Sequence, residues 1–186
     1  MAKIVIRPPL ASWSSEFEVL KSLLALAVPR GATIHHIGST AIPNLAAKDV
    51  IDIQVSVGSL DEVDAARLEE VGFRQIKGRV TDHCPPGMEL PDAELTKLFF
   101  KGASRPTHVH IRERGRFNQR FALLCRDFLR THPVAAGAYA LIKARLAERF
   151  PEDEDFYYDI KDPVFDIIVE GANEWANHTG WVEPSD

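Results

Sequence analysis

The sequence predicts an α+β protein, in which a small mixed β-sheet packs against helices on one face and the C-terminal part is helical. Apolar and polar residues alternate strictly over 51–57, which is typical of a half-buried strand. Two further strand-like runs within 98–112 are separated by a short gap, which favours an antiparallel hairpin. From residue 117 onward, apolar residues recur at helical spacing. Because nothing repeats and no segment is of low complexity, we expect a single domain over residues 1–186.

The N-terminal part predicts a short strand and then a helix. An edge strand is expected over 3–7, where two prolines stop it. The helix is expected to start at Ser12, or at Ser15, where the spacing of a capping box begins, and to end before Gly31. Trp13 should then pack at the entrance of this helix. The apolar stripe of the helix consists of Phe17, Leu20, Leu24 and Ala27.

The stretch 33–56 is the most informative part of the chain. It predicts a strand ending at Gly38-Ser39-Thr40, a turn, and a second strand whose polar face carries Asp52 and Gln54. Glycine lets the backbone turn sharply and bring N–H groups towards an anion, and the two hydroxyl groups add donors. A phosphate-binding turn beside a strand carboxylate suits a nucleotide with a divalent metal ion. The alternative is an ordinary turn that binds no ligand.

The middle of the chain predicts one more helix, a long loop and a strand pair. The helix is expected over 59–71 and a short strand over 73–76. Residues 79–96 have no regular pattern, and long loops of this kind are often functional or mobile. The hairpin strands then lie at 98–102 and 107–112.

A pair of histidines lies on the second hairpin strand. His108 and His110 are two positions apart, so both side chains leave the same face. Such a pair suits metal binding, phosphate binding or proton transfer, or is only the polar face of a half-exposed strand. His36, next to the Gly38 turn, is a further candidate. A zinc site that adds His83 and Cys84 to the pair is an alternative, although its spacing matches no usual structural pattern.

The last third predicts three helices. The first covers 117–130 and closes at Thr131-His132-Pro133, and the second covers 138–146. Asp162 followed by Pro163 is a strong start signal for the last helix. The three apolar stripes are Phe117, Phe121, Leu124 and Phe128; Ala138, Leu141, Ile142 and Leu146; and Phe165, Ile168, Ala172 and Trp175.

Composition restricts the class of protein. No apolar run approaches the ~20 residues that a membrane span needs, and the N-terminus does not have the pattern of a secretory signal. Cys84 and Cys125 are far apart in the sequence, which argues against a disulfide framework, and Cys125 reads as a buried apolar residue. We therefore expect a cytoplasmic protein without a membrane partner. The net charge of −5 argues against dedicated nucleic-acid binding.

Charge is unevenly distributed along the chain. Between residues 148 and 170, nine acidic residues accompany only two basic ones. The segment 101–130 is basic, and either it forms solvated helix faces or it faces an anionic ligand. Its basic residues are Lys101, Arg105, Arg112, Arg114, Arg116, Arg120, Arg126 and Arg130.

Several segments together resemble one protein family. The segment HHIGSTAIPNLAAKDVIDI is similar to the GrpB family, and so are HVHIRERG, RFALLCRDFLRTHP, and Tyr158 with Lys161. The resemblance covers nearly the whole chain and implies a nucleotidyltransferase-like fold. It also favours a first helix that starts near Ser12. Because the family also occurs fused to dephospho-CoA kinases, the resemblance implies a small phosphorylated ligand, either a nucleotide or a CoA-like molecule.

The resemblance also implies roles for the residues of the central stretch. Asp52 would hold Mg²⁺, the turn Gly38-Ser39-Thr40 would bind phosphates, and His108 and His110 would assist catalysis by proton transfer or coordination. The nucleotidyltransferase pattern has a second acid two residues after the first, where this chain has Gln54, a neutral and poorer metal ligand. Alternatively, Asp52 is a strand-end acid that pairs with a basic side chain.

Four basic residues are the candidates for binding ligand phosphates: Lys48, Arg120, Arg126 and Lys161. For Lys48, Arg126 and Lys161 the alternative is a structural ion pair with an acidic residue. The resulting hypothesis is a nucleotidyltransferase-fold protein that binds a phosphorylated ligand and performs metal-dependent nucleotidyl transfer. The alternative is a ligand-binding or accessory module that has lost catalysis, which Gln54 favours.

Overall fold

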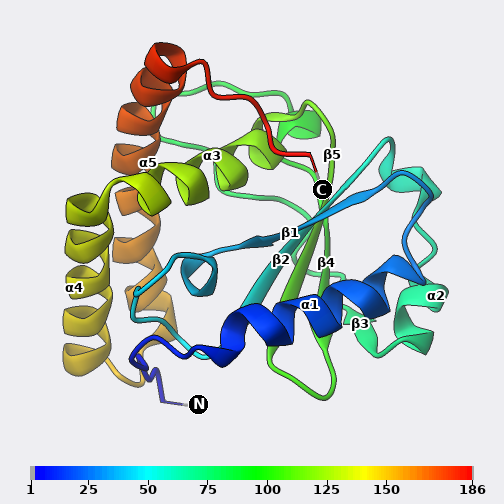
Figure 1. Cartoon of the computed structure of the whole chain (residues 1–186), viewed down its shortest axis with the longest axis horizontal. Coiled ribbons are helices and arrows are strands. Elements are labelled where there is room, and N and C mark those ends of the chain that lie inside the picture. Colours follow the sequence, from blue (N-terminus) through cyan, green and yellow to red (C-terminus); the bar gives the residue numbers. More distant parts are fainter. Residues whose placement is uncertain (1–2, 186) are drawn as a thin grey trace.

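The structure is a computed structural model that describes residues 3–185. Its centre is a five-stranded mixed sheet with the strand order β1-β2-β5-β4-β3 (Figure 1). The strands β2 and β5 run parallel, and the other neighbouring pairs run antiparallel. The strands are β1 (Thr33–Ile37), β2 (Ile51–Val57), β3 (Phe73–Gln75), β4 (Leu98–Gly102) and β5 (Thr107–Glu113).

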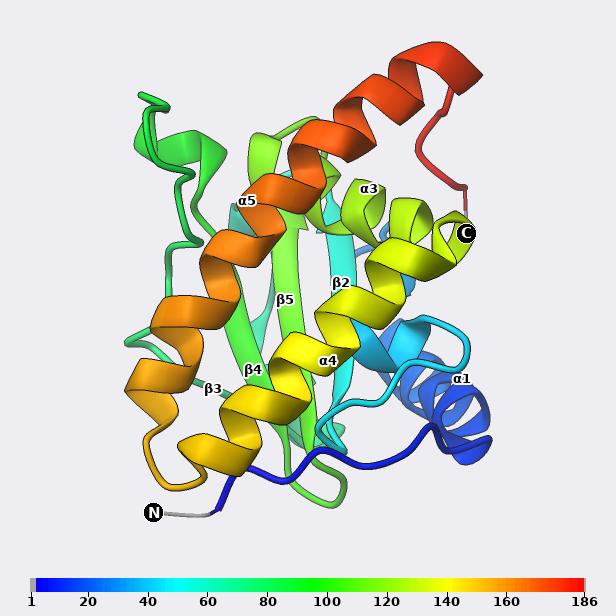
Figure 2. The ribbon, with the colours of Figure 1, turned by 90° about the vertical axis from the view of Figure 1, so that its left-hand side faces the viewer.

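The predicted α+β class is confirmed, but helices lie on both faces of this sheet and not on one face as predicted (Figures 1 and 2). The helices α1 and α2 cover one face, and α4 and α5 cross in front of the strands on the other, with α3 beside them (Figures 1 and 2). None of the helices in residues 3–185 is long and apolar enough to cross a membrane. The helices are α1 (Ser12–Ala25), α2 (Ala65–Glu70), α3 (Phe117–Thr131), α4 (Pro133–Arg149) and α5 (Glu154–Thr179).

The two faces of the sheet differ in chemistry, as the alternation in β2 predicts. The odd-numbered residues of β2 are buried in an apolar core with α1, α2, β3, β4 and β5. The even-numbered residues, Asp52, Gln54 and Ser56, lie on the opposite face, where Gln119 of α3 contacts Gln54 and Ser56. One face of the sheet is therefore covered by the apolar core, and the polar face is available for a ligand-binding site.

The N-terminal predictions are partly wrong. Residues 3–7 form no strand, and only one bridge joins Arg7 to Ala47. The helix α1 starts at Ser12, as the family resemblance favours, and its first turn has no side-chain cap. Trp13 is buried at the helix entrance as predicted, and its indole Nε1 donates to Asp49 at 2.9 Å.

The predicted helix over 59–71 is divided in two. Ser59 caps a short 3₁₀ turn over Leu60–Glu62. Asp64 then accepts from the backbone N–H groups of Ala66 and Arg67 and begins α2. An internal Asp competes for backbone donors, so it starts a new helix instead of continuing the old one. The loop 79–96 is irregular as predicted, apart from one 3₁₀ turn over Asp92–Glu94.

Two features of the C-terminal helices differ from prediction. The helix α5 begins at Glu154, capped by Asp153, and Pro163 lies inside it. Tyr157 is buried against α4 and the N-terminal segment, so packing keeps the turns before the proline helical. In α4 the buried face carries Tyr139 and Lys143, whereas Leu141 of the predicted stripe is 59% exposed. Both differences bring polar side chains towards the sheet.

Candidate functional site

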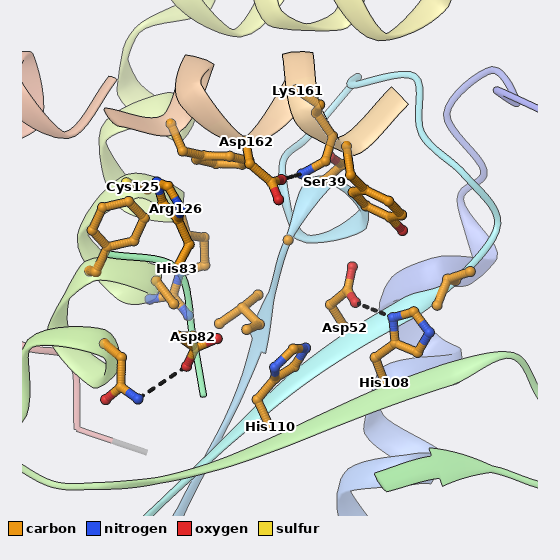
Figure 3. Close-up of a pocket in the computed structure, with 18 of the residues that line it drawn as sticks. Ser39, Asp52, Asp82, His83, His108, His110, Cys125, Arg126, Lys161 and Asp162 are labelled. Carbon is orange, nitrogen blue, oxygen red and sulfur yellow. Dashed lines mark hydrogen bonds and ion pairs between the residues drawn. The ribbon is translucent and has the colours of Figure 1, made fainter. Parts of the chain in front are cut away.

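A pocket of about 530 Å³ lies between the polar face of the sheet and the helices α3, α4 and α5 (Figure 3). Side chains from β2, β5, the turn after β1, the loop 79–83 and all three helices line it. Of the predicted site residues, the pocket wall includes Gly38, Ser39, Thr40, Lys48, Asp52, His108, His110, Arg126 and Lys161. The C-terminal helices thus bring together residues that are far apart in the sequence.

The turn after β1 is pressed against Asp52. Gly38 has a φ of +69°, and an added Cβ would lie 2.5 Å from Oδ2 of Asp52. Only glycine fits this position, because the left-handed conformation and the close approach both exclude a side chain. The next residues, Ser39–Ala41, form one 3₁₀ turn without a side-chain cap.

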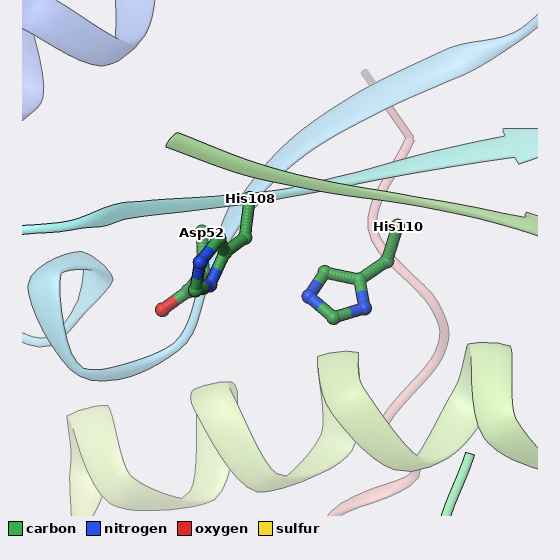
Figure 4. A group of neighbouring side chains, drawn as sticks. All are labelled: Asp52, His108 and His110. Carbon is green, nitrogen blue, oxygen red and sulfur yellow. The ribbon is translucent and has the colours of Figure 1, made fainter. Parts of the chain in front are cut away.

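Asp52, His108 and His110 come together at the floor of the pocket (Figure 4). The parallel pairing of β2 with β5 places Asp52 beside His108 and Gln54 beside His110. Nδ1 of His108 lies 3.2 Å from Oδ1 of Asp52. One ligand atom from each of the three residues lies within 4.8 Å of the others. In residues 3–185, this is the only group of three or more such side chains with this spacing.

A buried ion network lies behind His110. Asp82, from the loop 79–96, accepts from Lys97 at 2.5 Å and from Arg112 at 2.8 and 3.0 Å. Burial by itself raises the pKa of Asp82, but Arg112 and Lys97 outweigh it and hold that pKa well below its usual range. Nδ1 of His110 lies 3.4 Å from both cations. Burial, Arg112 and Lys97 therefore keep the pKa of His110 well below 6.5.

The structure places Gln54 outside the group of possible metal ligands. The side chain is fully buried, and its Oε1 accepts from Nη1 of Arg112 at 2.5 Å. Its Nε2 donates to the backbone oxygen of Gln119 at 3.0 Å. The prediction that Gln54 binds metal is therefore corrected: the amide joins β2 to α3, and its oxygen is already occupied.

Lys143 is a site residue that the sequence reasoning missed. It is 2% exposed, and Nζ donates to Oγ of Ser39 at 2.7 Å and to the backbone oxygen of Ala46 at 2.8 Å. Burial, together with the nearby Lys161, lowers the pKa of Lys143 to about 7 against an opposing effect of Asp52. A lysine within a helix is usually predicted to be exposed to solvent. Only its helical spacing from Tyr139 and Leu146 could have indicated that Lys143 is buried.

Two of the four predicted phosphate ligands project into the pocket beside aromatic rings. Nζ of Lys48 donates to the hydroxyl of Tyr158 at 2.6 Å. Nζ of Lys161 lies 5.2 Å from the ring centre of Tyr158 and pairs with Asp162 at 2.6 Å. Tyr158, Lys161 and Asp162 share one face of α5 because the helix is continuous through these positions.

The other two predicted phosphate ligands have structural partners. Arg120 is outside the pocket and donates to Asn173 at 2.9 Å, so its predicted role is corrected to a link between α3 and α5. Arg126 is on the pocket wall, but it donates to Asp127 at 2.7 Å and to the backbone oxygen of His36 at 3.1 Å. Helical spacing alone cannot predict which of these two arginines is exposed, because that depends on what packs against α3.

His36 and the hydroxyl of Thr40 are engaged with each other. Nε2 of His36 lies 2.9 Å from Oγ1 of Thr40, and the ring stacks on Phe17 of α1. Burial, with Arg130 and Arg126 nearby, lowers the pKa of His36 to about 4 against the opposing effect of Asp52. The sequence suggested that His36 joins the other two histidines. The structure does not place it with them, and its bond to Thr40 holds the turn in place.

The zinc set with His83 and Cys84 is also not assembled. His83 Nε2 lies 2.9 Å from Asp166 of α5, and Cys84 Sγ donates weakly to the backbone oxygen of Met88. Both cysteines are free, and Cys125 is buried in the core between the C-terminal helices, as expected.

The residues at the pocket floor do not fit Mg²⁺ well. Mg²⁺ prefers oxygen ligands in octahedral geometry, usually carboxylates and water. Here one carboxylate lies with two imidazoles, and the position of a second acid is taken by Gln54. The donor set therefore disagrees with the expected Mg²⁺.

Comparison with known proteins gives a consistent result. The profile of the family described as GrpB protein matches residues 3–171. A protein of Mycolicibacterium paratuberculosis named dephospho-CoA kinase is 33% identical over 97% of this chain and 48% of its own length. The UPF0157 protein YqkA of Bacillus subtilis is 36% identical over 88% of this chain and 45% of its own length. The chain thus spans about half the length of these curated relatives.

A solved structure supports the same assignment. The crystal structure of the conserved protein GrpB from Enterococcus faecalis superposes with a TM-score of 0.76 at 26% identity. It covers 92% of this chain and 99% of the other. The mixed sheet and its helices agree with the nucleotidyltransferase-like fold that the resemblance implies. The chain therefore belongs to the GrpB family.

Proposed function

We propose that this protein binds a small phosphorylated ligand, a nucleotide or a CoA-like molecule, with its phosphates beside Ser39, Lys143 and Lys161. The observation that carries the proposal is Lys143. Within residues 3–185 no carboxylate lies close enough to its Nζ for an ion pair, and its hydrogen-bond partners are a hydroxyl and a carbonyl. A buried ammonium group without a counterion is costly, and an anion from solution would offset that cost.

The surroundings of Lys143 suit phosphate oxygens. The turn at Gly38 exposes backbone and the Ser39 hydroxyl to the pocket, and Lys161 and Lys48 add two further cations. Each of these lysines also has an acidic neighbour, Asp162 for Lys161 and Glu154 for Lys48. Lys143 is therefore the strongest candidate to pair with the ligand, and the other two lysines would add long-range attraction.

The pocket also has apolar walls. Phe117, Phe121 and Leu129 of α3 and Phe165 of α5 line it. A volume of about 530 Å³ is typical of pockets for small ligands. Aromatic walls beside a cationic end would accept a nucleobase or another flat or aliphatic group attached to phosphates.

Nucleotidyl transfer is the reaction that we propose for this ligand if the protein is an enzyme. The relative named dephospho-CoA kinase suggests a CoA-like molecule as one ligand to test. The second candidate is a binding module without catalysis. It is favoured by one observation, that Gln54 replaces a second acid and is bound to Arg112. A binding titration followed by a product assay with the same ligand separates the two candidates. Binding with product formation supports the enzyme, and binding without product supports the binding module.

Replacing Lys143 with methionine tests the proposal. We expect calorimetry with nucleotides and CoA derivatives to give a dissociation constant at least about tenfold higher in the variant, since a charge-assisted hydrogen bond contributes about 1.5–3 kcal/mol. The matched control is Lys101→Met, because Lys101 is exposed on β4 away from the pocket. Equal affinities in both variants and the parent would refute the role of Lys143.

The pH dependence of binding gives a second test. With a pKa of about 7, Lys143 is charged below pH 7 and neutral above it, so anion affinity should be full below pH 7 and fall above it. A bound anion stabilises the charged form, which moves this fall to higher pH. Phosphate itself is already doubly ionised above pH 7, so it does not cause the fall. Calorimetry at several pH values should show that the affinity of Lys143→Met does not depend on pH. If the affinity of the variant falls above pH 7 as in the parent, the assignment is wrong.

A further inference from the structure

We propose that Asp52, His108 and His110 form a binding site for a divalent transition-metal ion such as Zn²⁺, Fe²⁺ or Co²⁺, and not for Mg²⁺. This inference goes beyond the proposed phosphate ligand and does not depend on it. It rests on the positions of three side chains on two paired strands and on the chemistry of their donor atoms.

The geometry suits one ion between the three side chains. Strand pairing fixes Asp52 and His108 beside each other, and their nearest donor atoms are 3.2 Å apart. Two ligands that share one ion at about 2.0–2.2 Å are separated by a similar distance. His110 lies two residues further along β5, with the ring nitrogen other than Nδ1 pointing towards Asp52 and His108 (Figure 4). All three side chains are partly exposed to the pocket, so an ion has a path of entry and open positions for a further ligand.

The donor set determines the class of ion. Imidazole nitrogen binds zinc, iron, cobalt and nickel well, whereas Mg²⁺ seeks oxygen and keeps its water. Two imidazoles with one carboxylate form the set found in catalytic zinc sites and in non-haem iron sites with open positions. Strand β2 has no second carboxylate on the pocket face to offer a hard cation, because Gln54 and Ser56 follow Asp52 there.

His110, the third ligand, lies beside two cations that oppose metal binding. Removing one of these cations should therefore strengthen metal binding, which gives a specific test. Nδ1 of His110 faces Lys97 and Arg112 at 3.4 Å. A metal ion on the other ring nitrogen requires a proton on Nδ1, and that proton would face two cationic donors. Replacing Lys97 with methionine removes one of them and leaves Asp82 paired with Arg112. The Lys97→Met variant should therefore bind the ion more tightly than the parent, because the proton on Nδ1 then faces one cationic donor instead of two.

The test uses the full chain freed of metal, with Co²⁺ as a coloured probe. Co²⁺ should bind with one ion per chain, and Mg²⁺ in about 100-fold excess should not displace it. Asp52→Asn and His108→Gln should each weaken Co²⁺ binding by at least about 100-fold. His83→Gln is the matched control, because His83 pairs with Asp166 and not with the three ligands, and it should bind Co²⁺ like the parent.

The outcomes against the proposal are equally definite. Displacement of Co²⁺ by an equal concentration of Mg²⁺, or unchanged binding in Asp52→Asn and His108→Gln, would overturn it. If a ligand variant does not fold, nitrogen NMR of the parent decides, because Zn²⁺ must shift the ring signals of His108 and His110 but not of His83. Lys143→Met separates this site from the phosphate site, since that variant should lose ligand affinity and keep Co²⁺ affinity.

Discussion

Replacing Asp82 with asparagine is expected to lower the free energy of unfolding by about 3–5 kcal/mol. Asp82 is the shared carboxylate of Lys97 and Arg112, which are 7% and 5% exposed. It also accepts from Asn118 of α3, so it joins the loop 79–96 to the sheet and to a helix. Removing one member of a buried ion network leaves uncompensated charge, and that cost exceeds the value of an exposed ion pair.

Chemical denaturation at neutral pH measures this loss, with Glu89→Gln in the same loop as control. Glu89 is exposed, so its replacement should change the stability by less than about 0.5 kcal/mol. Adding Lys97→Met to Asp82→Asn should recover part of the loss, because one of the two unpaired cations is then removed. A loss no larger than that of Glu89→Gln would show that the network does not stabilise the fold.

The same network sets a pH dependence of stability. The pKa of Asp82 is lower in the folded protein than in the unfolded chain. Its contribution is therefore complete above the unfolded value of about 4 and is lost as the pH falls towards the folded value. The parent should lose more stability than Asp82→Asn in acid, so their unfolding free energies should converge below about pH 4. Parallel curves down to low pH would contradict this assignment.

Replacing Gly38 with alanine is expected to destabilise the fold by about 3 kcal/mol and to disrupt the site. A left-handed conformation costs a residue with a Cβ about 1–2 kcal/mol, and forced contact in a packed region adds about 1–3 kcal/mol. The new methyl group would meet Oδ2 and Cβ of Asp52 at 2.5 and 2.8 Å. Because Asp52 must move away, Co²⁺ affinity should fall together with stability.

Gly31→Ala separates the two costs. Gly31 has a φ of +82°, but nothing lies within 4 Å of an added Cβ. Its replacement should therefore show only the cost of the left-handed conformation and leave Co²⁺ and ligand binding unchanged. If thermal and chemical denaturation show equal losses for Gly31→Ala and Gly38→Ala, the contact between the turn and Asp52 is not important for stability.

Local patterns in the sequence predicted much of the fold and part of the site. The alternation over β2 indicated which face carries Asp52, and the spacing of His108 and His110 put both on one face of β5. The residues of the turn at Gly38 themselves indicated it, and the resemblance to the GrpB family, confirmed over residues 3–171, implied that it binds phosphates. The roles assigned to these residues remain predictions, whereas their positions around one pocket are structural facts.

The errors arose where packing overrides a local signal. Asp162-Pro163 reads as a helix start, but α5 begins at Glu154 because Tyr157 packs against α4. Arg120 and Arg126 look equivalent on a helix, yet one is exposed and bonds Asn173 while the other is buried under the β1 turn. Propensity is a weak guide in such cases, since tertiary contacts of several side chains outweigh one residue's preference.

The sequence by itself determined the α+β class, the family, and the strand faces that carry Asp52, His108 and His110, because each depends on periodicity or on a short motif. Only the tertiary structure decided which distant polar atoms meet. Lys143 reaches Ser39 across 104 positions, and Arg112 reaches Gln54 across 58. The first contact follows from how α4 packs over the turn after β1, and the second from the parallel pairing of β2 with β5. Burial lowers the pKa of Lys143, and burial is a property of the whole fold and not of a local segment.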